Sequence, residues 1–136
     1  MQYDFQKVNL IINYSGGTHY VTGFSSGSTI DAQRDGDRYT KHLGAKGDVT
    51  LAINNDNSGT IKFKLKNDSS SNKILNFLEQ TKEEFTANIY DSNSNGKGKA
   101  GGSDCVVMKD PGFIRGNEVQ ELEWTIGVPT LSIDYD

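Results

Sequence analysis

The sequence has very few of the residues that form disulfide bonds or bind metal ions. Cysteine occurs once, at Cys105, and histidine twice, at His19 and His42. One cysteine excludes an internal disulfide and a cysteine-rich metal site, and is typical of a reducing compartment or of one where disulfides are unnecessary. No signal peptide is expected, because no basic segment followed by an apolar stretch opens the chain. The glycosylation sequons at Asn13 and Asn67 therefore carry little weight.

Long apolar runs and a surplus of positive charge are also missing. No run approaches the ~18 apolar residues of a membrane-spanning helix, and the mean hydropathy is −0.61. The 14 Lys and Arg residues stand against 18 Asp and Glu residues, which gives a net charge of −4. Proteins that bind phosphate backbones usually carry a basic surplus, so the charge argues against nucleic-acid binding as the main function. The acidity remains compatible with a chain that must not stick to DNA.

The residues that are present indicate a β protein of one domain, residues 1–136. Glycine occurs 15 times and proline only twice, and apolar residues alternate with polar ones in many short segments. The clearest pair, residues 49–53 and 61–65, is predicted to form a hairpin around an Asn- and Gly-containing turn. Strands are predicted near residues 8–12, 20–24, 49–53, 61–65, 85–90, 105–108, 122–128 and 131–135.

Only one segment has helical periodicity. Ile74, Leu75, Phe77 and Leu78 form one apolar stripe after a Ser- and Asn-rich start at residues 69–72. The charged residues that follow, 79–84, are expected to end the helix. The predicted fold class is therefore mainly β, with antiparallel sheets packed on each other and a single helix.

Several motifs resemble ligand sites without meeting their requirements. The glycines of Gly96-x-Gly98-x-x-Gly101 match a dinucleotide fingerprint, but a strand and not a helix is predicted after them. Residues 91–96 and 31–36 begin like calcium loops, but the twelfth position is Gly102 or His42 in place of a bidentate glutamate. We therefore expect a hairpin tip and ordinary turns here, with no metal and no cofactor.

No catalytic group is predicted either. The two histidines and the distant Cys105 do not make a metal set, and Cys105 lies in an apolar run that favours a buried, inert thiol. Carboxylates two residues apart, such as Asp35 with Asp37, share one solvated face of a strand. The sequence predicts a protein that is not an enzyme.

Two predicted strands carry charges of opposite sign on their polar faces. One strand places Lys62, Lys64 and Lys66 on that face, and the strand near the C-terminus places Glu121 and Glu123 on its own. Two solvated faces that also protect strand edges explain this pattern. Charged contacts between strands of neighbouring subunits explain it equally well.

A stretch of 16 residues, 33–48, is predicted to be a long loop between strands and is dense in charges of both signs. Loops of this length in compact domains are usually functional or disordered. We interpret residues 34–48 as a contact arm, with a mobile solvated loop as the alternative. The candidate interface residues are Arg34, Asp35, Asp37, Arg38, Tyr39, Lys41, His42, Leu43, Lys46 and Asp48.

Three segments together resemble a known family. They are Gly23-Phe24-Ser25-Ser26-Gly27-Ser28, Asp37-Arg38-Tyr39-Thr40-Lys41-x-x-Gly44-Ala45-x-Gly47-Asp48-Val49-Thr50, and Asn57-Ser58-Gly59-Thr60-Ile61. They resemble the small tail tube proteins of contractile-tailed phages and phage-tail-like particles, which are related in fold to the ring proteins of type VI secretion. The helix and the late strand with Trp124 follow in the same order.

The resemblance implies two packed sheets with one helix, a β-sandwich or split barrel that closes into hexameric rings. Stacked rings would form a hollow tube in the virion tail, assembled in the bacterial cytoplasm, with sheath and baseplate proteins as partners and DNA only as cargo. The arm would reach an adjacent subunit or ring, and the acidity would suit a lumen that repels DNA. The alternative is a soluble β-sandwich module that binds carbohydrate or another ligand, although Trp124 alternates with apolar residues and is expected in the core.

Overall fold

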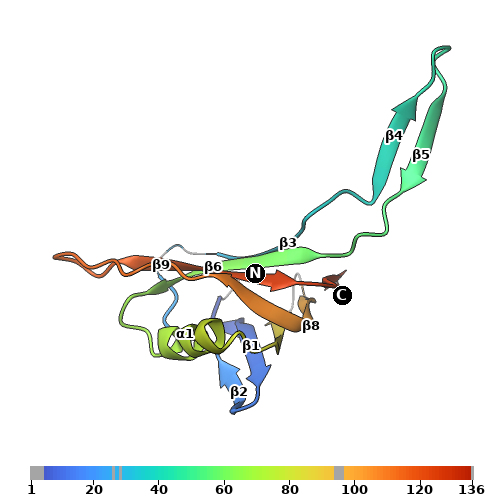
Figure 1. Ribbon diagram of the computed structural model, residues 1–136. Coiled ribbons are helices and arrows are strands. Elements are labelled where there is room, and N and C mark those ends of the chain that lie inside the picture. The colour runs from blue at the N-terminus through green and yellow to red at the C-terminus, as the bar shows by residue number, and fades with distance from the viewer. Residues whose placement is uncertain (1–4, 26, 28, 94–96, 136) are drawn as a thin grey trace.

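The computed structural model describes residues 5–25, 27, 29–93 and 97–135 of the chain. In these residues, strands and one α-helix build a two-layered body from which a narrow arm projects (Figure 1). The elements in chain order are the 3-10 turn η1 (Phe5–Lys7), β1 (Val8–Tyr14), β2 (Gly17–Tyr20), β3 (Ile30–Arg34), β4 (Tyr39–Leu43), β5 (Val49–Ile53), β6 (Gly59–Lys66), α1 (Ser71–Thr81), β7 (Phe85–Asp91), β8 (Gly98–Lys109), β9 (Glu121–Val128) and β10 (Ser132–Tyr135).

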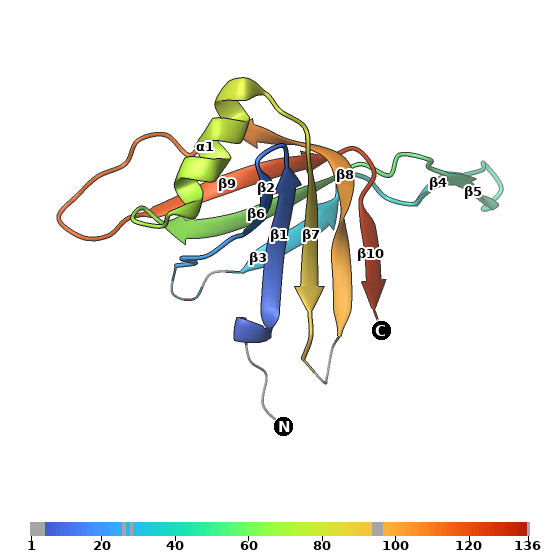
Figure 2. The same ribbon diagram turned by 90° about the horizontal axis from the view of Figure 1, so that it is seen from below.

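One antiparallel sheet folded over itself forms the body. Its strand order is β2-β1-β7-β8-β9-β6-β3, and β10 pairs with β8 from outside this path. Strand β8 belongs to both layers, since residues 98–105 pair with β7 and residues 106–109 pair with β9. Figure 2 shows β1, β7, β8 and β10 running across the direction of β9, β6 and β3. The end strands β2 and β3 do not pair with each other, so the described strands do not close a barrel.

The predicted fold class is confirmed at this level: the chain is mainly β, antiparallel and layered, with one α-helix. Alternation explains it, because β6 buries Ile61, Phe63 and Leu65 and exposes the residues between them. Strand β9 buries Trp124, Ile126 and others in the same way. Closure into a ring concerns several chains and stays a prediction.

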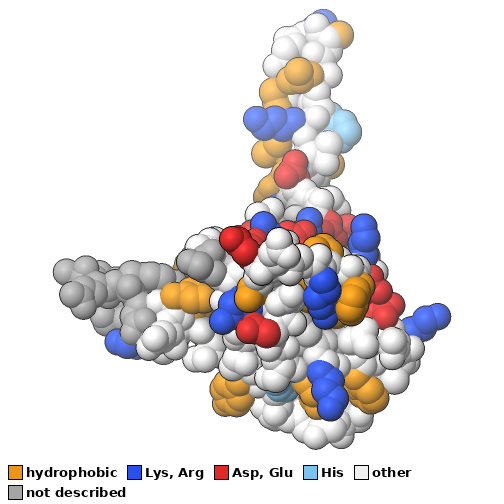
Figure 3. All heavy atoms as spheres, turned by 90° about the vertical axis from the view of Figure 1, so that its left-hand side faces the viewer, with side chains coloured by type: hydrophobic (Ala, Val, Ile, Leu, Met, Phe, Trp, Pro, Cys, Tyr) orange, Lys and Arg blue, Asp and Glu red, His pale blue; other side chains and the backbone are white. Residues whose placement is uncertain are grey.

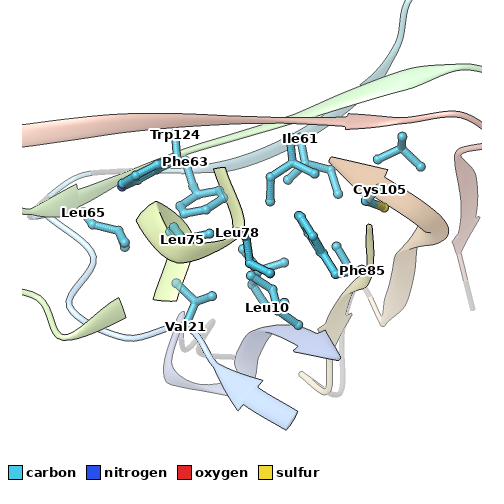
Figure 4. Close-up of a cluster of buried hydrophobic side chains, with 14 of the residues drawn as sticks. Leu10, Val21, Ile61, Phe63, Leu65, Leu75, Leu78, Phe85, Cys105 and Trp124 are labelled. Carbon is cyan, nitrogen blue, oxygen red and sulfur yellow. The ribbon is translucent and has the colours of Figure 1, made fainter. Parts of the chain in front are cut away.

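The core lies between the two layers and is completed by α1 (Figure 4). The helix ends where Lys82 adopts a left-handed conformation with φ 56° and Glu83 N–H donates to Leu78 O over 3.3 Å. Ser69 Oγ accepts the N–H of Ser71 at the other end, over 3.2 Å. The buried apolar residues of this cluster are Leu10, Ile12, Val21, Ile61, Phe63, Leu65, Leu75, Leu78, Phe85, Ala87, Cys105, Trp124, Ile126, Val128 and Leu131.

The predicted hairpin of residues 49–53 with 61–65 is wrong. Strand β5 pairs with β4, whereas β6 pairs with β3 and β9. The long loop predicted over residues 33–48 is wrong as well, because it contains the end of β3 and the whole of β4. The physical reason is that β3-β4 and β5-β6 run together as one long hairpin, interrupted on both sides at residues 35–38 and 54–58.

Two further boundaries differ from prediction. The strand near 20–24 ends at Tyr20, since Gly23 has φ +79° and packs so closely on Ser69 that a Cβ would lie 2.5 Å from its Cβ. The hairpin tip expected at the glycine motif is shorter than that motif, because β7 continues to Asp91 and β8, which contains Gly98 and Gly101, begins at Gly98. Residues 94–96 lie outside the described part.

Candidate assembly interface

The arm is an amphipathic two-stranded hairpin. Strand β4 pairs with β5 in the register Tyr39↔Ile53, Thr40↔Ala52, Lys41↔Leu51, His42↔Thr50 and Leu43↔Val49. Because side chains alternate along a strand, this register gathers the large apolar residues on one face, around Lys41. The other face carries Thr40, His42 and Thr50. The apolar side chains are between 55% and 79% exposed, and they are Tyr39, Leu43, Val49, Leu51 and Ile53, which we call the arm's apolar face.

This face stands clear of the body in the described structure (Figure 3). The hydrophobic side chains lie in a row along the projecting arm, beside a basic side chain. An isolated two-stranded hairpin is marginally stable at best in water, and it usually needs an apolar partner surface. The arm therefore has the shape and chemistry of a segment that docks onto another surface.

Hydrogen bonds fix the base of the arm. Asp35 accepts hydrogen bonds from Ser58 Oγ over 3.0 Å and from Thr60 Oγ1 over 2.8 Å. Arg38 Nη1 donates to Asn57 Oδ1 over 2.7 Å, and Arg38 O accepts the N–H of residue 54 over 2.7 Å. These bonds bridge the two sides of the long hairpin where strand pairing is interrupted, so the base of the arm is held mainly by side-chain hydrogen bonds.

A tight turn closes the far end. Gly44 N–H donates to Asp48 O over 2.7 Å, and Gly47 N–H donates to Gly44 O over 3.1 Å. Gly47 has φ +87°, a left-handed conformation that glycine adopts without steric cost. Lys46 is part of this turn, so a positive charge lies at the tip.

The structure distributes the predicted arm residues over one continuous feature. Arg34 ends β3 and points inward, where its Nη1 donates to Leu131 O. Asp35, Asp37 and Arg38 form the base. Tyr39, Lys41, His42 and Leu43 lie in β4, while Lys46 and Asp48 lie in the turn before β5. Their role in contacts between copies stays a prediction.

Sequence reasoning missed the second half of the arm. Val49, Leu51 and Ile53 alternate like the residues of a core strand, yet they are exposed. It also missed a second apolar surface in the long connection between β8 and β9, where Phe113 is 84% exposed and Val119 57%. Arg115 lies over the Phe113 ring, 4.0 Å from its centroid. Figure 2 shows this connection at the end of the body opposite the arm.

The predicted charged strands lie side by side in one chain. Strand β6 pairs with β9 over its whole length, so Lys64 faces Glu123 and Lys66 faces Glu121. Lys64 Nζ is 3.9 Å from Glu121 Oε2 across the diagonal. Lys62 faces Thr125 on this side. The lysine–glutamate pattern is therefore complementary within a single subunit, and contacts of these residues with a neighbouring subunit stay a prediction.

The polar groups that could suggest chemistry have structural partners. His19 Nε2 lies 2.8 Å from Ser71 Oγ, and partial burial lowers the pKa of His19. Cys105 is fully buried and donates to Gly102 O over 3.2 Å, and burial raises the pKa of its thiol. Among residues 5–25, 27, 29–93 and 97–135, no three His, Cys, Asp or Glu side chains are close enough to hold a metal ion.

The near-miss motifs lie partly on strands and partly in the adjoining turns where the structure describes them. Gly98 and Gly101 lie in β8, and Asp31 and Gln33 lie in β3, so neither set opens a helix or forms a ligand loop. Asn95 and Gly96 lie outside the described residues. No helix of the described chain is both long and apolar enough to span a membrane.

Comparison with known proteins identifies the family. The family described as "Bacteriophage PhiTE tail tube protein" matches residues 1–133. The chain belongs to this family. A curated relative, "Structural protein ORF10" of Pseudomonas phage KPP10, is 25% identical over 138 residues, which covers 95% of this chain and 79% of the relative. The protein is thus a structural component of the phage virion tail and is not an enzyme.

Solved structures show that the fold recurs in related particles. A chain of the gene transfer agent virion has a TM-score of 0.59 at 10% identity, with 99% of both chains covered. The cap of the anti-feeding prophage has a TM-score of 0.55 at 13% identity, covering 100% of this chain and 94% of that one. A chain of an extracellular contractile injection system, described as its sheath–tube complex, has a TM-score of 0.53 at 13% identity and covers 93% and 88%.

Proposed function

We propose that this tail tube protein assembles into hexameric rings that stack into a hollow conduit for DNA. Family membership supports a tube, and the arm's apolar face supports assembly through contacts between copies. Fully burying one side chain such as Leu43 or Leu51 stabilises a contact by about 1.5–3 kcal/mol. A face of five such residues repeated around a ring therefore supplies ample free energy for stacking.

Two apolar surfaces at opposite ends of the subunit support head-to-tail stacking. The arm lies at one end, and the connection with Phe113 and Val119 lies at the other (Figure 2). A contact between two different patches, repeated along one axis, builds open-ended stacks rather than closed dimers. The arm of one subunit would thus reach a subunit of the adjacent ring.

Unpaired strand edges support ring formation. Strands β2 and β3 each pair on one side only among the described strands. Edges of this kind are normally covered or paired, and closure of a sheet across subunits removes them. We propose that neighbouring subunits of one ring continue the sheet. The sheath–tube and baseplate complexes among the structural relatives support sheath and baseplate proteins as further partners.

The alternative function, a carbohydrate-binding module, receives no support from the aromatic residue it would need most. Trp124 is only 2% exposed, and its Nε1 donates to Asn72 Oδ1 over 2.9 Å. A stacking platform for a sugar requires an exposed ring face, so this indole cannot serve as one.

Electron microscopy of the arm variants tests the proposal. The wild-type protein, concentrated and negatively stained, is expected to form rings or tubes with a hollow centre. Leu43→Thr with Leu51→Thr keeps strand-forming residues but removes the apolar face, and it should raise the concentration needed for stacking at least about tenfold, which corresponds to about 1.4 kcal/mol. The control, Thr40→Ser with Thr50→Ser, alters the opposite face and should assemble normally. A wild-type protein that stays monomeric at every concentration would contradict the proposal.

A further inference from the structure

The outer face of strands β3, β6 and β9 is uncovered by any described element. Strand β6 points its apolar residues into the core and Lys62, Lys64 and Lys66 outward. The neighbouring strands follow the same alternation, so the sheet presents a largely polar surface on the side away from α1, with the exposed Met108 against Gly127 at its β8 margin. We call it the charged face, and its charged residues are Asp31, Lys62, Lys64, Lys66, Glu121 and Glu123.

The charges of this face are matched across strands. The register of the sheet sets every lysine of β6 directly opposite a carboxylate of a flanking strand: Lys62 opposite Asp31, Lys64 opposite Glu123 and Lys66 opposite Glu121. Acidic and basic side chains accordingly lie next to one another along the top of the body, at the foot of the arm (Figure 3). Three positive and three negative charges leave the charged face with no net charge.

Two charged residues of opposite sign lie next to the face. Asp35, which follows β3, accepts a hydrogen bond from Thr60, while Lys109 of β8 lies opposite Thr125 in the register. Asp35 and Lys109 thus add one charge of each sign beside the face. Because the whole chain carries −4, its acidic surplus lies elsewhere. The net charge of the whole chain therefore does not indicate the charge of this face.

A surface on which positive and negative charges are paired has little net attraction or repulsion for a polyanion such as DNA. Unmatched lysines would attract phosphates and release counterions, which is the main source of non-specific DNA affinity. Carboxylates in excess would repel the polyanion instead. Opposite charges a few ångströms apart cancel within the Debye length of about 8 Å at physiological salt. Such a surface neither binds a phosphate backbone nor opposes its approach.

We propose that the charged face lines the conduit and that its cross-strand pairs let duplex DNA slide past without adhering. The proposal rests on the proposed tube. The open edge of β3 borders this face, so the sheet can continue from one copy into the next along it. By contrast, the outer face of the other layer exposes Tyr20 and Tyr90, which suit contact with protein better than with phosphate.

Cysteine labelling of assembled tubes tests the location. Lys62→Cys places a thiol on the charged face, and Gln80→Cys places one on the exposed side of α1. The wild type is the blank, because Cys105 is buried. In tubes, Lys62→Cys should react with a small maleimide and not with a maleimide attached to a large polymer, whereas Gln80→Cys should react with both. In unassembled protein both sites should react with both reagents. Lys66→Cys repeats the test on the same strand.

The labelling outcomes separate the two proposals. If Lys62→Cys in tubes reacts with the large reagent as fast as Gln80→Cys does, or reacts with neither reagent, the charged face does not line the conduit. The proposed tube would still stand. Absence of tubes by electron microscopy would instead contradict the proposed function, and the location would fall with it.

Charge variants test the sliding surface. Glu121→Gln with Glu123→Gln leaves two lysines unmatched in every subunit, and a short DNA duplex should then sediment with the tubes. With six to ten phosphate contacts, this binding should fall roughly 10³-fold or more between about 50 and 200 mM salt. Wild-type tubes and the control Lys64→Gln with Lys66→Gln should leave the duplex in solution. Equal retention by wild-type and Glu-to-Gln tubes would overturn the proposal.

Discussion

The indole Nε1 of Trp124 donates a hydrogen bond to Asn72 Oδ1 over 2.9 Å and thereby joins β9 to the first turn of α1. Asn72 Nδ2 also donates to the backbone oxygen of Lys66, over 2.9 Å. One side chain thus connects the helix to two strands of the same layer. Since the indole is buried, loss of its acceptor leaves a buried donor without a partner.

Asn72→Ala should therefore lower the free energy of unfolding by about 1–3 kcal/mol. Urea unfolding followed by the fluorescence of the single tryptophan measures the change. The control is Gln80→Ala on the exposed side of the same helix, which should change stability by no more than about 0.5 kcal/mol. Equal unfolding midpoints for both variants would show that the hydrogen bond contributes nothing measurable.

Gly101 is a site where a side chain has no room. A Cβ there would lie 2.2 Å from Ala87 O, and the residue has φ +150°. We expect Gly101→Ala to lose about 3 kcal/mol of stability, near the upper end for overpacking. Gly112 also has a positive φ, +81°, but nothing lies within 4 Å of its Cβ position. Gly112→Ala should cost only about 1 kcal/mol of backbone strain, so comparison of the two thermal midpoints isolates the close approach.

The Cys105 thiol should make stability depend on pH at the alkaline end. Burial raises the pKa of this thiol in the folded protein. Between the unfolded and folded pKa values the native state holds more protons, so stability is present below the unfolded pKa of about 8.5 and is lost as pH rises above it. Cys105→Ala should be less stable at neutral pH because of the small cavity, but it should lack this component of the alkaline decline. Urea unfolding at a series of pH values checks the difference in slope.

The arm should be dynamic until it is covered. Among the described residues its two strands pair only with each other, and they bury none of their side chains. Their amides should therefore open with little free-energy cost. In hydrogen–deuterium exchange, a peptide over residues 39–53 should exchange rapidly in unassembled protein and become protected in tubes. The strand β6 peptide should be protected in both states. If the arm amides of a dilute monomer are already protected from exchange, the arm does not need a partner surface.

The helix and the central strands were predictable because their apolar patterns are satisfied inside one chain. Leu75 and Leu78 of α1, like Ile61 and Phe63 of β6, bury the stripe or face that their spacing creates. Burial of Trp124 followed from the same alternation. In these segments the local pattern and the tertiary contacts demand the same structure, which is why the pattern sufficed.

The arm was not predictable in the same way. Val49, Leu51 and Ile53 show the alternation of a buried strand, but alternation reports only that one face is apolar and not what covers it. Strand pairing was also beyond the pattern, since β5 and β6 are adjacent in the chain yet pair with different partners. The opposite charges of the two strands were visible in the sequence, but their pairing within one chain follows from the register, which the pattern does not give.

The glycine-rich segment before Cys105 misled for a different reason. Glycines there predict a turn, but Gly101 and Gly102 lie in β8, where neighbouring backbone approaches too closely for a Cβ. Gly102 would place its Cβ 2.4 Å from Thr130 O. Glycine marks both tight turns and close strand contacts, and sequence alone does not separate these two uses.

The sharing of β8 between both layers has a mechanical consequence. Its residues 98–105 pair with β7 and its residues 106–109 with β9, with a register shift in each pairing, so one sheet connects β2 to β3. A pull on one edge of the subunit is therefore carried to the other edge through the hydrogen bonds of each strand pair and the covalent backbone of β8, and not by side-chain packing alone. In the proposed tube, subunits of this kind would resist stretching and shear along a path of covalent chain and hydrogen bonds.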